Sequence, residues 1–243
     1  GERVAVDAAP AIVMQHLSGN FVFDSSAWEA ARRIKTAEEV ASIRDGLAMT
    51  TAGIAAALAT AKTGVTELEV AAAAEHAARV AGAEGFAFLT LCTSNGDTVR
   101  RRYASSHRFE PGDFVFTDVG VMNDGYCAEY SRATVIGDAI TDEQRAIFRT
   151  ALAANRAMMS AIKPGVMASQ LDLAAREAIL DSPYAPYIHR HVSGSGIGVL
   201  LQEAPIISNP FDGGIDEPIY AGMVLNVEPG VYHPEIGGLR AED

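Results

Sequence analysis

The chain has 243 residues, 49% of them hydrophobic, which is enough to build the core of one large domain or two small ones. Its 31 Asp and Glu against 19 Lys and Arg give a net charge of −12, which argues against nucleic acid or an anionic membrane as a partner. Cys92 and Cys127 lack metal-like spacing, so we expect no disulfide scaffold and no zinc site, and the cytoplasm as compartment. No apolar run reaches the ~20 residues that a membrane-spanning helix needs.

Residues 1–33 mix a short strand-like start, a helix-like stretch around 12–17 and an apolar patch at 21–23. The chain opens on Gly1 rather than Met, so we interpret these residues as the tail of a truncated N-terminal segment or as a linker. Residues 34–243 are expected to form the main domain, and the abrupt end at Asp243 suggests a C-terminal truncation as well.

Four helices are predicted within the main domain. Three of them begin with a pattern in which a Thr side chain and a Glu or Gln three residues later cap each other's backbone N–H groups. The three pairs are Thr36 with Glu39, Thr66 with Glu69, and Thr141 with Gln144. The predicted helices cover residues 37–61, 66–79, 141–162 and 168–180.

Strands are predicted between and after these helices. Apolar and polar residues alternate over 86–93, and residues 113–122 and 126–136 form two further strands. The turn between these two contains Asp124-Gly125, a strong hairpin signal because both residues tolerate positive φ. Later strands are expected at 197–202 and 224–232.

A short internal repeat accompanies this order of elements. Lys62-Thr63-Gly64-Val65 joins the first two helices, and Lys163-Pro164-Gly165-Val166 joins the last two. Such joints often use Lys and Gly, so the four-residue match alone decides little. The same order of long helix, turn, second helix and strands in both copies favours an α+β domain made of two similar halves.

Four acidic residues stand in small motifs marked by glycine. They are Asp118 in FTDVGVMNDGYCAEYSR with Glu129, Glu228 in GMVLNVEPG and Glu242 in GGLRAED. Carboxylates that converge in a fold need a cation or shared protons to offset their repulsion. Their convergence would therefore create a functional site.

From about residue 34 to its end the chain resembles the pita-bread family of methionine aminopeptidase, prolidase, aminopeptidase P and creatinase. The resemblance implies a pseudo-twofold repeat over a curved antiparallel sheet and, in the peptidases, two metal ions held by two Asp, one His and two Glu. Asp118 stands in the family's D-x-G strand, Glu129 at its second Asp, and Glu228 and Glu242 at its two Glu.

The family's histidines are replaced. Ser195 stands in the G-H-G-I-G motif at the metal-binding His, and Gln202 stands in H-E-x-P at the His that contacts substrate. A third His position falls within Arg100-Arg101-Arg102. The resemblance therefore gives Asp118, Glu129, Ser195, Glu228 and Glu242 as candidate metal ligands, an oxygen-only set that favours Mn, Mg or Ca. We expect one divalent cation, first of all Mn, or a metal-free site with a protonated carboxyl, as in creatinase.

The candidate catalytic residues are Glu228 or Glu242, which would activate water, and Gln202. Arg101 and His191 are candidate substrate-binding residues, since a guanidinium suits a substrate carboxylate.

The resemblance implies a divergent hydrolase of C–N bonds, close to Xaa-Pro dipeptidase, aminopeptidase P or creatinase, that acts on a peptide or small amino-acid-derived substrate as a homodimer. Two alternatives stay open: a non-catalytic peptide- or protein-binding module, and an ordinary dinuclear Xaa-Pro peptidase in which His189 or His191 replaces the missing ligand.

Overall fold

The computed structural model describes residues 3–6, 11–16, 19–100, 103–138, 140–209 and 215–243. Its helices are α1 (Ala11–Met14), α2 (Ser26–Arg33), α3 (Ala37–Thr60), α4 (Glu67–Val80), α5 (Asp97–Arg100), α6 (Asp142–Ala161), α7 (Ala168–Leu180) and the 3-10 turn η1 (Ala185–Tyr187). Its strands are β1 (Val4–Val6), β2 (Phe21–Phe23), β3 (Gly85–Phe86), β4 (Leu91–Ser94), β5 (Phe114–Asn123), β6 (Tyr126–Val135), β7 (Gly194–Gly196), β8 (Glu203–Ile207), β9 (Leu225–Val227), β10 (Gly230–His233) and β11 (Gly237–Arg240).

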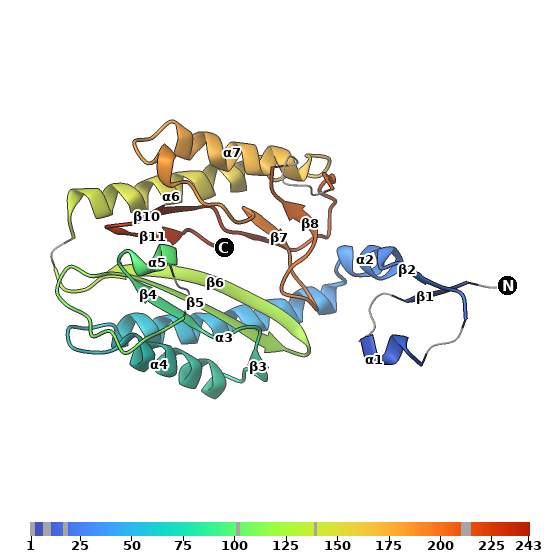
Figure 1. Cartoon of the computed structure of the whole chain (residues 1–243), viewed down its shortest axis with the longest axis horizontal. Coiled ribbons are helices and arrows are strands. Elements are labelled where there is room, and N and C mark those ends of the chain that lie inside the picture. Colours follow the sequence, from blue (N-terminus) through green and yellow to red (C-terminus); the bar gives the residue numbers. More distant parts are fainter. Residues whose placement is uncertain (1–2, 7–10, 17–18, 101–102, 139, 210–214) are drawn as a thin grey trace.

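The main body is layered, with strands between two pairs of helices (Figure 1). Helices α3 and α4 cover one side, and α6 and α7 cover the other. The elements β1, α1 and β2 lie apart from this body, and α2 lies between them and it. The division of the chain at residue 34 stays a prediction.

All strand pairs of the main body are antiparallel. Strand β5 is central: β6 pairs with one edge, while β3 and β4 pair with different parts of the other edge. Strand β7 lies between β8 and β9, and β10 pairs with β11. Away from the body, β1 and β2 form a parallel pair. The predicted α+β class is confirmed.

The capping patterns define the helix starts as expected. The Thr36 side chain accepts from the Glu39 backbone N–H at 3.2 Å, and the Glu39 carboxylate accepts from the Thr36 N–H at 2.7 Å. The same reciprocal pair opens α4 and α6. Because these bonds satisfy backbone donors that a helix start leaves unpaired, the four predicted helices match α3, α4, α6 and α7 to within about a residue at each end.

Strand β5 separates two hydrophobic cores. Its residues Val115, Val119 and Val121 pack in the core beneath α3 and α4, whereas Phe114 and Phe116 belong to the core beneath α6 and α7. This follows from the alternation of side chains along a strand. The second face, which also carries the even-numbered position 118, therefore looks toward the interior of the molecule between the two halves.

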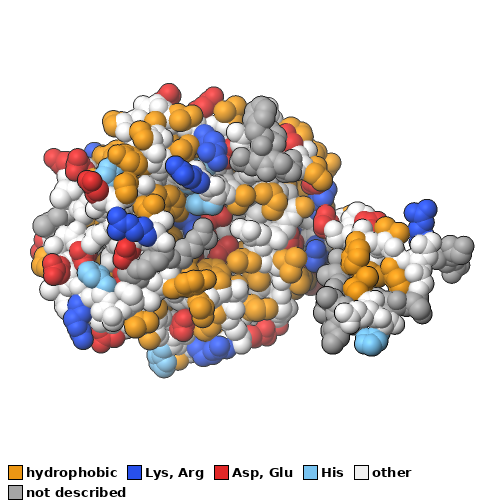
Figure 2. Space-filling model, in the orientation of Figure 1, with side chains coloured by type: hydrophobic (Ala, Val, Ile, Leu, Met, Phe, Trp, Pro, Cys, Tyr) orange, Lys and Arg blue, Asp and Glu red, His pale blue; other side chains and the backbone are white. Residues whose placement is uncertain are grey.

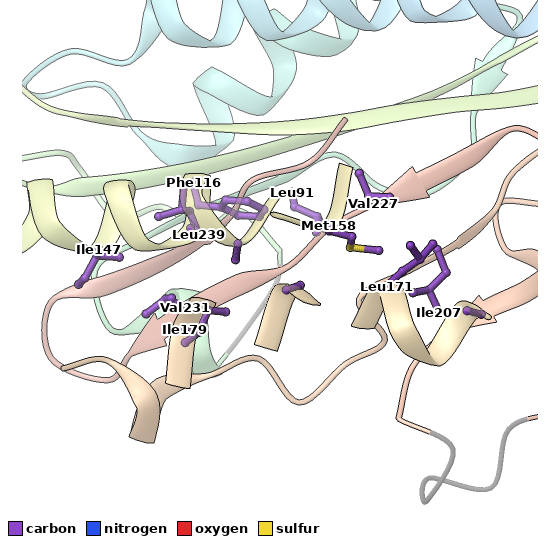
Figure 3. Close-up of a cluster of buried hydrophobic side chains, with 14 of the residues drawn as sticks. Leu91, Phe116, Ile147, Met158, Leu171, Ile179, Ile207, Val227, Val231 and Leu239 are labelled. Carbon is purple, nitrogen blue, oxygen red and sulfur yellow. The ribbon is translucent and has the colours of Figure 1, made fainter. Parts of the chain in front are cut away.

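The second core closes this interior from the other side (Figure 3). Met158 of α6 and Leu171 of α7 pack with strand residues that include Ile207, Val227 and Val231. Each of these side chains is at most 1% exposed. This packing fixes the positions of β8, β9 and β10. Glu228, one of the four acids, directly follows β9.

The predicted repeat is visible in the backbone. Gly64 and Gly165 adopt φ of +84° and +91°, a region that a residue with a Cβ rarely enters. The Gly64 N–H donates to the Phe109 carbonyl at 2.8 Å, and the Gly165 N–H donates to the Ile219 carbonyl at 2.8 Å. The two helix joints thus make equivalent bonds in the two halves.

Three strand predictions need correction. The strand expected at 197–202 is wrong: these residues lie between β7 and β8, because the Glu203 carboxylate accepts from the Leu200 N–H at 3.0 Å and turns the chain. The strand expected at 224–232 is interrupted after β9, where Pro229 has no N–H for a ladder. The strand expected at 86–93 divides into β3 and β4.

Gly46 in α3 allows the helix to approach the sheet closely. A Cβ at this position would lie 2.8 Å from the Ala128 Cβ of β6. We expect Gly46→Ala to destabilise the protein by about 1–2 kcal/mol, because overpacking outweighs the gain in helix propensity. Urea unfolding measures this loss. Adding Ala128→Gly should recover part of it, and a single variant as stable as the wild type would contradict the prediction.

None of the described helices combines the length and the apolar character needed to cross a bilayer.

Candidate functional site

Asp118 and Glu129 share one face of the sheet because of the β5–β6 register. Asp118 lies opposite Ser131, and Gly120 lies opposite Glu129. Opposite partners in an antiparallel pair point to the same face, as do residues two apart along a strand. The hairpin therefore brings the two predicted ligands together on the interior face.

Gly120 leaves space beside Glu129. A Cβ on Gly120 would lie 2.2 Å from an edge carbon of the Phe88 ring, so only glycine lets this ring lie against the strand. Phe88 in turn lines a cavity next to the carboxylates. The glycine of the D-x-G motif thus makes room for an apolar wall of the site.

Glu228 and Glu242 are brought together by a backbone pair. The Val227 N–H donates to the Asp243 carbonyl, and the Asp243 N–H donates to the Val227 carbonyl, each at 3.1 Å. Glu228 follows Val227, and Glu242 precedes Asp243. The ends of β9 and β11 consequently present two carboxylates side by side.

The four predicted acids are all buried. Carboxylate oxygens of Asp118, Glu129 and Glu242 lie within 4.8 Å of one another. Their residues are 0%, 8% and 0% exposed, and Glu228 is 7% exposed. Glu228 joins them through a shared contact with Arg240. The structure thus places the four acids in one cluster.

Arg240 is a member of this cluster that the sequence interpretation missed. Its Nε donates to Glu242 Oε2 at 2.9 Å and lies 3.2 Å from Glu228 Oε2, and its Nη2 donates to Asp118 Oδ2. Burial disfavours the charged guanidinium, but the neighbouring carboxylates, Asp118 first, outweigh this and raise the pKa of Arg240 well above its usual value. One signal was available: residues two apart on an extended chain, such as 240 and 242, share a face.

Asn226 is the second residue that the sequence interpretation missed. Its Nδ2 donates to Glu129 Oε1 at 2.7 Å and to Glu242 Oε1 at 3.0 Å. Asn226 lies on β9, four residues after Gly222, the start of the GMV motif, and nothing in its local pattern marks it as a site residue. Its amide group thus forms a hydrogen bond with one carboxyl group from each half of the fold.

Glu129 has a strongly perturbed ionisation. Burial, followed by the charges of Glu242, Asp118 and Glu228, raises its pKa to about 10. Without a cation, Glu129 therefore carries a proton near neutral pH. This proton removes one of four negative charges from a cluster in which Arg240 is the positively charged partner.

Ser195 lies on β7 and is 1% exposed. Its Cα is paired with that of Asn226 across the β7–β9 ladder. Ser195 is thus buried next to the site, but its neutral hydroxyl is a weaker metal ligand than an imidazole. Its role as a metal ligand stays a prediction.

Two cavities adjoin the carboxylate cluster. The smaller has a volume of about 190 Å³ and is lined by Phe88, Leu91, Tyr103, Asp118, Glu129, His191, Val192, Leu201, Gln202, Glu228 and Arg240. The larger has a volume of about 720 Å³ and shares Leu91, His191 and Arg240 with the smaller. The shared residues make the two cavities neighbours, with the acids on the wall of the smaller one.

The residues predicted to contact the substrate lie in different places. His191 lines both cavities, and its Nε2 lies 3.0 Å from the Tyr232 hydroxyl. Gln202 lines the smaller cavity. Arg101 lies outside the described residues, although its neighbour Arg100 lines the larger cavity. Their roles in binding and catalysis stay predictions.

Lys35 supports the segment that carries Gln202. Lys35 Nζ lies 2.8 Å from Glu203 Oε2, and the two side chains are 2% and 4% exposed. Arg32 adds a second, longer ion pair to Glu203 at 3.9 Å. This buried pair ties the start of β8 to the chain just before α3, a contact between residues too distant in sequence to be predicted.

His189 lines neither cavity. Its Nε2 lies 2.6 Å from Ser193 Oγ, and this hydroxyl donates to Asp172 Oδ1 at 2.5 Å. Burial first, then the charge of Arg176, lowers the pKa of His189 to about 4. His189 is therefore a neutral interior residue, and the alternative in which it replaces a missing ligand gains no support.

The donor set fits one divalent cation. Carboxylate oxygens of Asp118, Glu129 and Glu242 lie within 4.8 Å of one another, close enough for one cation to contact all three acids. The buried Asn226 Oδ1 also has no hydrogen-bond partner among the described residues. An all-oxygen set of this kind suits Mn²⁺, Mg²⁺ or Ca²⁺.

Comparisons with known proteins identify the family of this chain. The family model of metallopeptidase family M24 matches residues 41–243. The Xaa-Pro dipeptidase of Pyrococcus furiosus is 36% identical over 214 residues, which is 87% of this chain and 60% of the relative. The Xaa-Pro dipeptidase of Lactobacillus delbrueckii subsp. lactis is 35% identical over 185 residues, 75% of this chain and 48% of the relative. The chain thus spans about half to three fifths of these two relatives.

Solved structures give the same result. The prolidase from Pyrococcus furiosus superposes with a TM-score of 0.92 at 31% identity, covering 100% of this chain and 72% of the other. The X-Pro aminopeptidase from Thermotoga maritima MSB8 gives a TM-score of 0.89 at 28% identity, with 99% and 69% covered. The predicted pita-bread fold is confirmed, and this chain belongs to metallopeptidase family M24.

Proposed function

We propose that this chain carries the hydrolytic centre of a peptidase that cleaves Xaa-Pro dipeptides or similar small amino-acid derivatives with the help of one divalent cation, Mn²⁺ first. The observation that supports this is the buried cluster of Asp118, Glu129, Glu228 and Glu242 beside two cavities. Relatives named as Xaa-Pro dipeptidases support the substrate class. A homodimer and a cytoplasmic location are further expectations.

Each group has a distinct task in this proposal. A bound cation would lower the pKa of a water molecule and polarise the carbonyl of the scissile bond. Of the two candidate proton acceptors we favour Glu228, because it lines the smaller cavity and Glu242 is not among the residues that line it. Arg240 holds three carboxylates in fixed positions.

The cavity walls would orient the substrate and limit access of water. His191, whose ring lies within hydrogen-bond distance of the Tyr232 hydroxyl, would contact the substrate from the wall that the two cavities share. Gln202 presents an amide to the smaller cavity, which Asp118, Glu129 and Glu228 also line. Phe88 and Leu91 supply apolar surface beside the reacting bond, which strengthens electrostatic interactions there.

The test is a dipeptide assay with metal-loaded and chelator-treated protein. Chromatographic detection of free proline from Xaa-Pro dipeptides, compared with Xaa-Ala controls, measures turnover. We expect Mn²⁺-dependent cleavage of the Xaa-Pro series and its loss in Glu228→Gln. A protein that retains stoichiometric Mn²⁺ but cleaves no amide would instead support a binding module, and one that retains no cation would refute the metallohydrolase mechanism.

A further inference from the structure

Asn226 contacts two of the four acids of the carboxylate cluster. It lies on β9, and its Cα is paired with that of Ser195 on the antiparallel strand β7. Side chains of opposite residues in such a pair share a face and are close enough to touch. A short side chain at 195 leaves room for the longer one at 226.

The amide nitrogen fixes the orientation of this side chain. Asn226 Nδ2 donates to Glu129 Oε1 at 2.7 Å and to Glu242 Oε1 at 3.0 Å. One –NH₂ group thus uses both of its hydrogens on two acids of the cluster. Glu242 accepts hydrogen bonds at both of its oxygens, from Asn226 and from Arg240, so the reversed amide would place two acceptors against each other at this acid.

The amide oxygen is buried without a partner. Asn226 is 4% exposed, and its Oδ1 has no hydrogen-bond partner among the described residues. A buried acceptor left without a donor or a cation costs free energy. The amide group that donates to two acids therefore also has an oxygen atom available as a metal ligand.

We propose that Asn226 Oδ1 is a direct ligand of the divalent cation. This inference rests on the cation site of the proposed function and names a ligand beyond the acids. Amide oxygens are ordinary ligands for hard divalent cations. Being neutral, this oxygen completes a donor set without adding another negative charge to Asp118, Glu129 and Glu242.

Ser195 is the competing neutral donor, and it provides the matched control. It is buried directly across the ladder from Asn226. Ser195→Ala and Asn226→Ala each remove one candidate oxygen from the same face of the sheet. Comparing the two variants shows which of the two neutral oxygens contributes more to cation binding.

Isothermal titration of the chelator-treated protein with Mn²⁺ tests the proposal without any need for turnover. We expect Asn226→Ala to weaken Mn²⁺ binding on the order of tenfold to a hundredfold. Ser195→Ala should weaken Mn²⁺ binding less than Asn226→Ala does, because a neutral hydroxyl is the weaker metal ligand. Asn226→Asp keeps the oxygen and loses both N–H donors, so it should bind Mn²⁺ at least as tightly as the wild type.

The Asp variant separates a ligand from a side chain that only positions the acids. If Asn226 acted through its hydrogen bonds alone, Asn226→Asp would lose Mn²⁺ affinity as Asn226→Ala does, and the proposal would be overturned. Equal Mn²⁺ affinity of Asn226→Ala and wild type would also overturn it, while the cation site itself stands. A wild-type protein that binds no Mn²⁺ would refute that site together with this inference.

Discussion

Arg240→Ala should destabilise the metal-free protein by about 3–5 kcal/mol, because it leaves buried carboxylates without their positive partner. In the wild type this guanidinium contacts Asp118, Glu228 and Glu242 at once. Urea unfolding at pH 7.5 in the presence of a chelator measures the loss.

Arg100→Ala gives the matched control for this prediction. Arg100 pairs with Asp97 at 4.0 Å, and the two side chains are 72% and 40% exposed. An exposed pair of this kind contributes at most about 1 kcal/mol, so the control should remain close to wild-type stability. Equal stability losses for Arg240→Ala and Arg100→Ala would show that the carboxylate cluster does not depend on the Arg240 guanidinium.

Glu129→Gln should change how stability depends on pH. The pKa of Glu129 is raised from 4.5 to about 10, so the folded protein keeps a proton that the unfolded chain releases above pH 4.5. The free energy of unfolding should then fall as pH rises between these values, by at most about 1.4 kcal/mol per unit. Glutamine stays neutral and still accepts from Asn226, so the variant should lack this decline.

Chelator-treated wild type and Glu129→Gln should consequently diverge as pH rises from 5.5 to 9 in urea unfolding. At the upper end the variant should be the more stable by about 2 kcal/mol or more. Glu110→Gln, at an exposed position, should follow the wild-type curve. Parallel curves for wild type and Glu129→Gln would contradict the raised pKa.

Local signals explain how much of the fold was predictable. The capping pairs at Thr36, Thr66 and Thr141 act within four residues, so the helix starts could be inferred from sequence alone. The Asp124-Gly125 turn likewise determines the β5–β6 register. The strand expected at 197–202 failed because a distant contact, Glu203 with Lys35, stabilises a turn where the apolar pattern suggested a strand.

The candidate site, too, could be predicted from the sequence only in part. Its four acids were identified because each stands in a recognisable motif, and the structure clusters them. Arg240 and Asn226 were missed, since their importance depends on contacts between elements that only the folded chain brings together. Arg101 lies outside the described residues, so its predicted role remains open to experiment.

The repeated architecture has a consequence for how the centre forms. Asp118 and Glu129 come from the first half of the duplication, and Glu228 and Glu242 come from the second. Neither half owns a complete centre, so docking of the halves and assembly of the centre are one equilibrium. If acids from both halves held a cation, the free energy of cation binding would add to the stability of the whole domain.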